Sequence, residues 1–159
     1  MSKKTKVLIV DDHSVVIEGI KTLLSSETDF EVMGSATDGH QALSLIKSKK
    51  PDIVILDISM HSMDGIDAAR KIKQRDEKIG IVVYSMSGSK EHITALFKEG
   101  VSGYVLKEEP LSELRSALNV VRDGATFYSK SVQKILMNRV KKLDLTKEKD
   151  VAEGRDGLA

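Results

Sequence analysis

The stretch that decides the fold is IVILD, residues 53–57, in which a run of apolar residues ends in a carboxylate. An unbroken apolar run of this length is typical of a strand buried on both faces, as in a parallel sheet. A second run, VLIV at residues 7–10, ends in Asp11 and Asp12. Open α/β sheets bind ligands at the carboxyl ends of their strands. The two stretches therefore predict an acidic pocket at one edge of a sheet, suited to a divalent metal.

Strand-type runs alternate with segments of helical period along the first 124 residues. Strands are predicted at residues 6–10, 30–36, 53–57, 80–85 and 103–106. The segments between them carry apolar residues at i, i+3, i+4 or i+7 spacing, which is typical of amphipathic helices. Apolar strands joined by helices favour a parallel sheet covered on both faces, with right-handed crossovers. We expect an α/β fold, a doubly wound three-layer sandwich.

Composition narrows the class of protein. The chain has 159 residues, 40% of them apolar, which predicts one globular domain plus an extension. It has no cysteine and a formal net charge of +1, so thiolate chemistry is excluded and no overall bias toward nucleic acid is expected. No apolar stretch approaches the roughly 20 residues that span a bilayer, and no signal-peptide core is present. We expect a cytoplasmic protein without a membrane partner.

Polar side chains follow the predicted strands at the edge where the acidic pocket is expected. Mg²⁺ prefers oxygen ligands and keeps several waters, so two carboxylates and a backbone carbonyl suffice to hold it. A lysine ammonium group and a serine hydroxyl facing the same point would bind the remaining oxygens of a phosphoryl group. The pocket therefore predicts phosphoryl transfer to a carboxylate. The strand-end residues are Asp11, Asp12, Asp57, Ser85 and Lys107, and the carbonyl is that of Ser59.

Four segments together resemble the receiver domain of two-component response regulators. They are VLIVDDH at residues 7–13, DISMHSMDG at 57–65, VYSMS at 83–87 and GYVLK at 103–107. The resemblance covers residues 6–123 in order and with the family's spacing. It implies a flavodoxin-like (βα)5 fold with a parallel five-stranded sheet in the order 2-1-3-4-5. A C-terminal helix is expected to follow this domain.

The resemblance also implies a role for each pocket residue. Asp57 would accept a phosphoryl group from a sensor histidine kinase, with Mg²⁺ as the cofactor. Once phosphorylated, Asp57 would attract the Ser85 hydroxyl, and the movement of Ser85 would free space into which Tyr104 can turn. The face formed by the fourth helix, fifth strand and fifth helix would change shape. The implied metal ligands are Asp11, Asp12, Asp57 and the Ser59 carbonyl, the phosphate contacts are Ser85 and Lys107, and the switch residues are Ser85 and Tyr104.

Some positions depart from the commoner family pattern. His61 stands where a proline usually follows the methionine of the acceptor loop, which predicts a more mobile loop. Lys107 is followed by Glu-Glu-Pro, so the Lys-Pro peptide that many receivers hold in cis is absent, as in the branch with a LuxR-type helix-turn-helix output. Lys107 must then be positioned in another way. The histidines lack metal-ligand spacing and are expected to be surface or cap residues; they are His13, His40, His61 and His92.

The sequence divides into a receiver domain, residues 1–125, a linker or extra amphipathic helix, 126–144, and a flexible tail, 145–159. The tail opens with LTKEKDV, which resembles the start of a LuxR-type DNA-binding domain. Such a domain needs on the order of 60 residues for its own core. The chain is therefore either a fragment of a longer transcription factor or a receiver that signals through protein contacts. DNA contact is expected only through an output domain absent from this chain, and homodimerisation through the fourth-to-fifth-helix surface or the extra helix.

Two classes of function remain open. The first is a phosphoacceptor switch, and the alternative is a pseudo-receiver, a constitutive interaction module that is never phosphorylated. Retention of Asp57, Lys107 and both acidic residues after the first strand favours the switch. No GxxxxGK[ST] or GxSxG motif occurs, so we expect no enzymatic activity beyond self-phosphorylation and self-dephosphorylation at Asp57.

Overall fold

The computed structural model describes residues 3–62 and 64–138 of the chain. Strands and helices alternate from the first strand to the fifth helix, as the sequence predicts. Each predicted strand agrees with an observed one to within one residue at either end. The elements are β1 (Thr5–Val10), α1 (Ser14–Ser25), β2 (Phe30–Ala36), α2 (Gly39–Lys49), β3 (Ile53–Leu56), α3 (Gly65–Arg75), β4 (Gly80–Ser85), α4 (Lys90–Lys98), β5 (Gly103–Leu106), α5 (Leu111–Arg122) and β6 (Phe127–Tyr128).

The strands form one parallel sheet in the order β2-β1-β3-β4-β5-β6. The predicted order 2-1-3-4-5 is confirmed, and the structure adds a sixth strand at the edge beside β5. This strand is only two residues long, too short for a periodic pattern. Its backbone bonds, Phe127 N–H to Ser102 O and Ser129 N–H to Tyr104 O, come from pairing with β5 and not from its own sequence.

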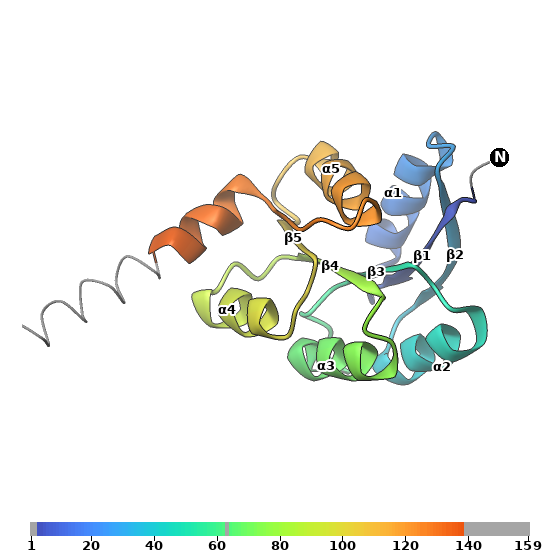
Figure 1. Cartoon of the computed structure of the whole chain (residues 1–159), viewed down its shortest axis with the longest axis horizontal. Helices are drawn as coiled ribbons and strands as arrows, with labels where there is room; N and C mark the ends of the chain where they lie inside the picture. Colours follow the sequence, from blue (N-terminus) through green and yellow to red (C-terminus); the bar gives the residue numbers. More distant parts are fainter. Residues whose placement is uncertain (1–2, 63, 139–159) are drawn as a thin grey trace, which may run out of the picture.

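The sheet lies between two layers of helices (Figure 1). Helices α1 and α5 cover one face, and α2, α3 and α4 cover the other. Each layer encloses its own apolar cluster, one containing Ile20 and Leu118, the other Ile72 and Leu96. All four residues of β3 are buried, as expected for a strand with neighbours on both sides and helices on both faces. The three-layer sandwich is confirmed.

A helix at residues 130–138 follows β6, which supports the expected amphipathic helix. It begins after Ser129, whose side-chain oxygen accepts the N–H of Val132 at 3.4 Å. The Val132 side chain is fully buried in the cluster on the α4 side of the sheet, and Ile135 and Leu136 pack against that cluster. This helix therefore docks on its own domain. The remainder of the expected helix and the predicted tail, residues 139–159, lie outside the described residues.

Among the described residues, no helix is long and apolar enough to cross a membrane.

Gly65, the first residue of α3, packs directly against the loop that follows β3. A Cβ atom at this position would overlap the Cα, Cβ and Cγ2 atoms of Ile58, whereas a Cβ at Gly19 in α1 would meet open space. We expect Gly65→Ala to lower the free energy of unfolding by about 1–3 kcal/mol through overpacking. Gly19→Ala is the matched control and should raise it by up to about 1 kcal/mol. Urea unfolding measures both, and equal shifts in one direction would contradict the packing argument.

Docking of the C-terminal helix can be tested by chemical labelling, because the chain has no native cysteine. The Val132 side chain is fully buried, whereas Met137 on the same helix is 57% exposed. We expect the thiol of Val132→Cys to react with an aromatic disulfide reagent about 100-fold more slowly than that of Met137→Cys, since it reacts only when the helix opens. Equal rates would show that the helix leaves the domain in solution.

Candidate acidic pocket and switch site

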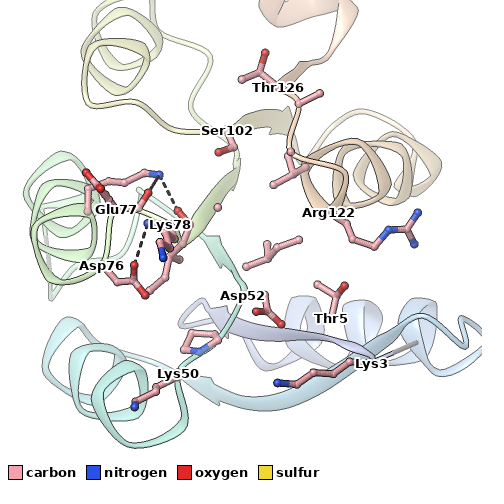
Figure 2. A pocket seen from close by; sticks show the side chains of 18 of the residues that line it. Lys3, Thr5, Lys50, Asp52, Asp76, Glu77, Lys78, Ser102, Arg122 and Thr126 are labelled. Carbon is pink, nitrogen blue, oxygen red and sulfur yellow. Dashed lines mark hydrogen bonds between the residues drawn. The ribbon is translucent and has the colours of Figure 1, made fainter. Parts of the chain in front are cut away.

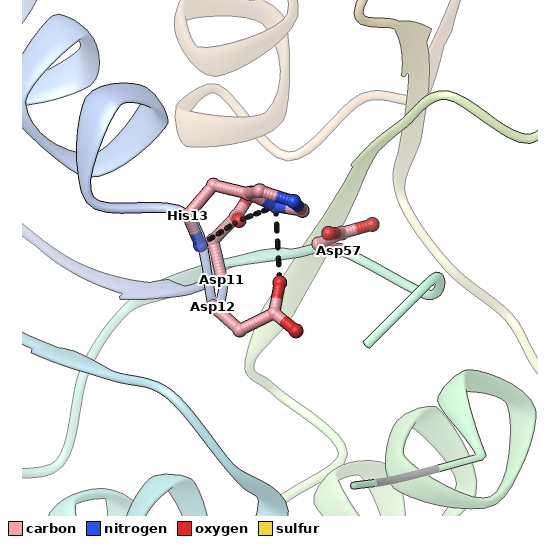
Figure 3. Close-up of side chains that lie close together, drawn as sticks. All are labelled: Asp11, Asp12, His13 and Asp57. Carbon is pink, nitrogen blue, oxygen red and sulfur yellow. Dashed lines mark hydrogen bonds and ion pairs between the residues drawn. The ribbon is translucent and has the colours of Figure 1, made fainter. Parts of the chain in front are cut away.

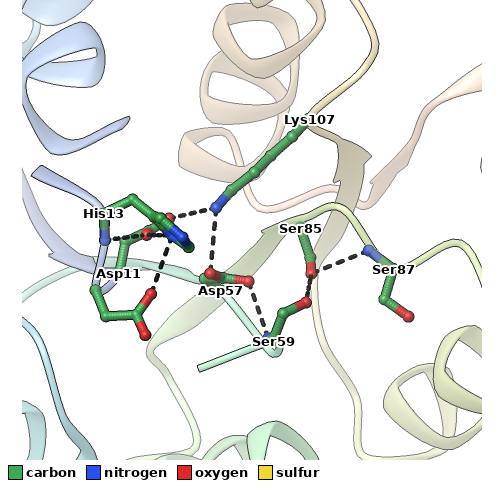
Figure 4. Close-up of polar contacts among 8 residues, drawn as sticks. Asp11, His13, Asp57, Ser59, Ser85, Ser87 and Lys107 are labelled. Carbon is green, nitrogen blue, oxygen red and sulfur yellow. Dashed lines mark hydrogen bonds and ion pairs between the residues drawn. The ribbon is translucent and has the colours of Figure 1, made fainter. Parts of the chain in front are cut away.

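The predicted pocket residues meet at the carboxyl edge of the sheet (Figure 4). Asp11 follows β1, Asp57 follows β3 and Lys107 follows β5, so three strand ends each deliver one ionisable group. The Lys107 Nζ atom lies 2.7 Å from Asp11 Oδ2 and 3.2 Å from Asp57 Oδ2. The structure thus brings together side chains that are up to 96 positions apart in the sequence, as the strand-end argument predicts.

Asp57 is held at the floor of the pocket. Its residue is 1% exposed, and its backbone N–H donates to Val10 O at 2.9 Å, which continues the sheet ladder one residue past β3. Its side chain accepts the Ser59 N–H at Oδ1, at 2.9 Å, and faces Lys107 at Oδ2. A buried carboxylate is stable only when it is paired and hydrogen-bonded, and Asp57 has both kinds of partner.

Lys107 balances the acidic residues. Burial acts to lower the pKa of its ammonium group, but the hydrogen bond to Asp11 and the charges of Asp57 and Asp11 outweigh burial and raise its pKa above the ordinary value. Its backbone N–H donates to Ser85 O, and the following turn is closed by a bond from the Leu106 N–H to Glu109 Oε1 at 2.9 Å. The Glu109 side chain thus supports a turn in which no Lys-Pro peptide is present.

His13 extends the pocket beyond what the sequence analysis anticipated (Figure 3). It is the N-cap residue of α1, in line with the expected cap position. Its ring, however, places Nδ1 3.1 Å from Asp11 Oδ1 and 3.0 Å from Asp12 Oδ1. Its position next to the two aspartates in the sequence was the available hint. The contact itself depends on the tertiary structure, because the start of α1 directs the His13 ring back over the end of β1.

The donor set fits a hard divalent cation. Asp11, Asp12, His13 and Asp57 each offer an atom within 4.8 Å of the others. Asp12 Oδ1 is buried and makes no hydrogen bond; the His13 ring lies close to it, but not in hydrogen-bonding geometry. A buried carboxylate oxygen without a donor is unfavourable, and a cation would satisfy it. Carboxylate oxygens are the ligands that Mg²⁺ prefers, so these residues fit the predicted ion. The Ser59 carbonyl stays a predicted ligand.

The hydroxyl group of Ser85 lies at the same edge of the sheet but makes no hydrogen bond with Asp57. Ser85 is fully buried, and its Oγ lies 2.8 Å from Ser59 Oγ and accepts the Ser87 N–H at 3.3 Å. Ser59 therefore lies between the carboxylate and the Ser85 hydroxyl in the hydrogen-bond network (Figure 4). The sequence analysis placed Ser85 correctly at the strand end and missed its partner.

Tyr104, the predicted aromatic switch residue, lies inside the domain. Its residue is fully buried, and its hydroxyl donates to Ser87 O at 2.7 Å. Burial, with the charge of Asp57, raises the pKa of this phenol. Tyr104 thus lies inside the domain with its hydroxyl held by the loop after β4. Its switch role stays a prediction.

A sizeable hollow on the described part of the molecule lies elsewhere. It has a volume of about 710 Å³ and is lined at the amino-terminal edge of the sheet by charged residues of both signs, including Lys3, Asp52 and Lys78 (Figure 2). None of the predicted site residues lines it. Pocket size alone would therefore point away from the acidic cluster, and the cluster is identified by its chemistry.

Comparisons with known proteins agree with this geometry. Residues 7–119 match the response regulator receiver domain family. The chain is 32% identical over 150 residues to the transcriptional regulatory protein DegU of Brevibacillus brevis. The aligned region covers 94% of this chain and 64% of DegU. It is 32% identical over 145 residues to the nitrate/nitrite response regulator protein NarL of Escherichia coli K12, covering 91% of this chain and 67% of NarL. The chain thus spans about two thirds of the length of these relatives.

Solved structures give the same result. A two-component response regulator of the LuxR family from Aurantimonas sp. SI85-9A1 superposes with a TM-score of 0.81 at 31% identity, covering 87% of this chain and 99% of that one. The isolated REC domain of RcsB from Salmonella enterica serovar Typhimurium, in the presence of phosphomimetic BeF3⁻, superposes with a TM-score of 0.79 at 26% identity, covering 84% and 99%.

The two aspartates after β1 are expected to respond oppositely to neutralisation. Without Mg²⁺, Asp12→Asn should raise the free energy of unfolding by about 1 kcal/mol, because it removes one of several crowded carboxylates. Asp11→Asn should lower it by about 1–3 kcal/mol, because Lys107 loses its shortest ion pair. Added Mg²⁺ should stabilise the unmodified protein, and at least about tenfold more Mg²⁺ should be needed for Asp12→Asn.

Thermal unfolding in EDTA and across a Mg²⁺ series measures these effects. Glu18→Gln, which removes an exposed carboxylate from α1, is the control and should change neither quantity. An Asp12→Asn variant that is destabilised in EDTA and gains as much from Mg²⁺ as the unmodified protein would contradict the assignment of Asp12 as a ligand.

Proposed function

Because the chain belongs to the response regulator receiver family, we propose that it is a phosphoacceptor switch in which a sensor histidine kinase phosphorylates Asp57 in a Mg²⁺-dependent reaction. The observation that carries this proposal is the position of Asp57. It is buried, it follows the central strand β3, and it is paired with Lys107 beside the two aspartates after β1. No other carboxylate in the described part of the chain has this set of neighbours.

The chemistry follows from these contacts. A carboxylate oxygen of Asp57 forms a bond to phosphorus, the bond from phosphorus to the kinase histidine breaks, and the electron pair remains on the imidazole. Such transfer depends mainly on positioning and on neutralising charge on the equatorial oxygens. The Ser59 N–H orients the Asp57 carboxylate, and Lys107 supplies a fixed positive charge. Mg²⁺, held by Asp11, Asp12, Asp57 and the Ser59 carbonyl, would supply further charge neutralisation.

Phosphorylation then changes the local balance of charge. The phosphoryl group would extend the negative charge of Asp57 toward Ser85, whose buried hydroxyl lies at the end of β4. Ser85 accepts the Ser87 N–H, and the Ser87 carbonyl accepts the Tyr104 hydroxyl. Movement of Ser85 is thus passed to Tyr104 and to the start of α4. The α4-β5-α5 face changes by a shift between two populated states, which needs only a few kcal/mol of differential interaction.

The output is proposed from the relatives. DegU is a transcriptional regulatory protein, and one solved structure shows two RcsB dimers bound to two parallel DNAs. We propose that this chain is the regulatory part of a LuxR-type transcriptional regulator, with DNA contact through an output domain and homodimerisation as part of the response. The stretch that resembles the start of such a domain, residues 145–151, lies outside the described residues. Cytoplasmic location stays a prediction.

The pseudo-receiver is the competing function. It shares the fold but needs no accessible phosphoacceptor, so it accounts less well for an acidic cluster with an unsatisfied Asp12 oxygen beside a lysine-paired Asp57. In both cases the chain is proposed to lack enzymatic activity beyond phosphorylation and dephosphorylation of its own Asp57.

Phosphorylation from a small-molecule donor tests the function without knowledge of the kinase. With acetyl phosphate and Mg²⁺, we expect the intact mass to increase by one phosphoryl group, and the increase to be lost in EDTA and in Asp57→Asn. Asp67→Asn, which removes a partly exposed carboxylate from α3, is the matched control and should be modified as the unmodified protein is. Absence of modification together with absence of beryllofluoride binding would favour the pseudo-receiver.

A further inference from the structure

Two serine hydroxyls meet at the boundary between the phosphoacceptor and the switch. Ser59 Oγ, two residues after Asp57, lies 2.8 Å from Ser85 Oγ at the end of β4. The Ser59 backbone is fixed by its N–H bond to Asp57 Oδ1. Ser59 therefore contacts the acceptor through its backbone and the switch residue through its side chain (Figure 4).

The difference in burial between the two serines assigns the direction of this hydrogen bond. Each hydroxyl has one proton, and either oxygen can be the donor on distance alone. Ser85 is fully buried and already accepts the Ser87 N–H, so its proton needs an acceptor inside the protein. Ser59 is exposed, and its own proton can be donated to water. The arrangement that satisfies both groups has Ser85 donating to Ser59.

We propose that Ser59 acts as a latch, in the sense that its hydroxyl oxygen accepts the hydrogen bond of the Ser85 hydroxyl in the unphosphorylated state. This bond stabilises the unphosphorylated state and so opposes the transition to the active state. This inference rests on the proposed phosphorylation of Asp57. A phosphoryl oxygen on Asp57 offers the Ser85 hydroxyl a stronger, charged acceptor. Ser85 can donate to it only by giving up the bond to Ser59. Ser59 is in this sense a positioning residue that sets how readily the switch responds.

Removal of the Ser59 hydroxyl should therefore favour the active state. In Ser59→Ala, the unphosphorylated state loses the acceptor for a buried hydroxyl, whereas the phosphorylated state keeps the Ser85 bond to the phosphoryl group. A net hydrogen bond of ordinary strength corresponds to a change of about three- to tenfold in an equilibrium constant. A ligand that binds the active state should bind Ser59→Ala more tightly by about that factor.

The experiment is a titration of the whole chain with beryllofluoride in saturating Mg²⁺, followed by amide chemical shifts. We expect the dissociation constant to fall about three- to tenfold in Ser59→Ala. Ser59→Thr retains a hydroxyl and should lie closer to the unmodified protein. A second readout needs neither ligand nor metal: in Ser59→Ala, the amide shifts of Ser85 and Ser87 should move part of the way toward their beryllofluoride-bound positions.

Two controls separate a latch from a general loosening of the loop. Ser62→Ala removes an exposed hydroxyl from the same loop and should leave the dissociation constant unchanged. In a Ser85→Ala background, the Ser59→Ala substitution should have no further effect, because the hydrogen bond is already absent.

The outcomes distinguish this inference from the proposed function. If the unmodified protein does not respond to beryllofluoride and Mg²⁺, the phosphoacceptor proposal fails. If it responds, but Ser59→Ala binds with equal or lower affinity and its unliganded amide shifts do not move, the latch is overturned and the phosphoacceptor proposal stands. The latch would also be overturned if Ser59→Ala lowered the dissociation constant equally in the unmodified and Ser85→Ala backgrounds.

Discussion

The ammonium group of Lys107 lies between the carboxylates of Asp11 and Asp57, and this contact joins the ends of three strands at one edge of the sheet. Without the lysine, the carboxylates would repel one another in a partly buried pocket where water screens their charges only weakly. With it, one ammonium group contacts both carboxylates, and their charges together with the hydrogen bond to Asp11 raise the pKa of Lys107 despite its burial. The rest of the site depends on this arrangement.

The positive charge of Lys107 does not fully offset the negative charge of the pocket, and the excess negative charge suits a cation. One lysine offsets two carboxylates, while Asp12 leaves a buried oxygen without a hydrogen bond. A divalent cation would correct both deficits, in line with the proposed binding of Mg²⁺ at this pocket. Structural ion pairs are usually satisfied internally, so an unsatisfied one is better explained by a ligand than by stability.

On the side of Asp57 away from Lys107, the neighbouring side chains are uncharged hydroxyl groups. Ser59, Ser85 and Ser87 form a short chain of neutral hydrogen bonds that ends at the buried Tyr104 hydroxyl. Neutral bonds of this kind are roughly half as strong as charge-assisted ones, so they are the bonds most easily exchanged for a charged acceptor. The helix at residues 130–138 packs against the same apolar cluster that contains Tyr104. The proposed switch residue Tyr104 and the helix at residues 130–138 therefore share one apolar cluster.

The sequence by itself determined the strands, their order through a family resemblance, and the acidic and basic residues at the strand ends. These follow from periodicity and from the rule that parallel strands end at a common edge, both of which are local or topological. The apolar residues of the helix after residue 129 likewise indicated an amphipathic element. Its docking surface could not be predicted, because a stripe of apolar residues does not identify its partner.

Only the tertiary structure decided the finer contacts. The sixth strand forms by pairing with the free edge of β5. The two residues of β6 are too few to show a strand-type alternation in the sequence. The contact of His13 with both aspartates depends on how α1 begins, and the Ser59–Ser85 bond joins residues 26 positions apart. Tyr104 is buried because the surrounding core closes over it, not because of its neighbours in sequence. Such contacts depend on how the elements pack against one another, which residue types and spacing do not encode, and they decide how the side chains of the predicted site are held.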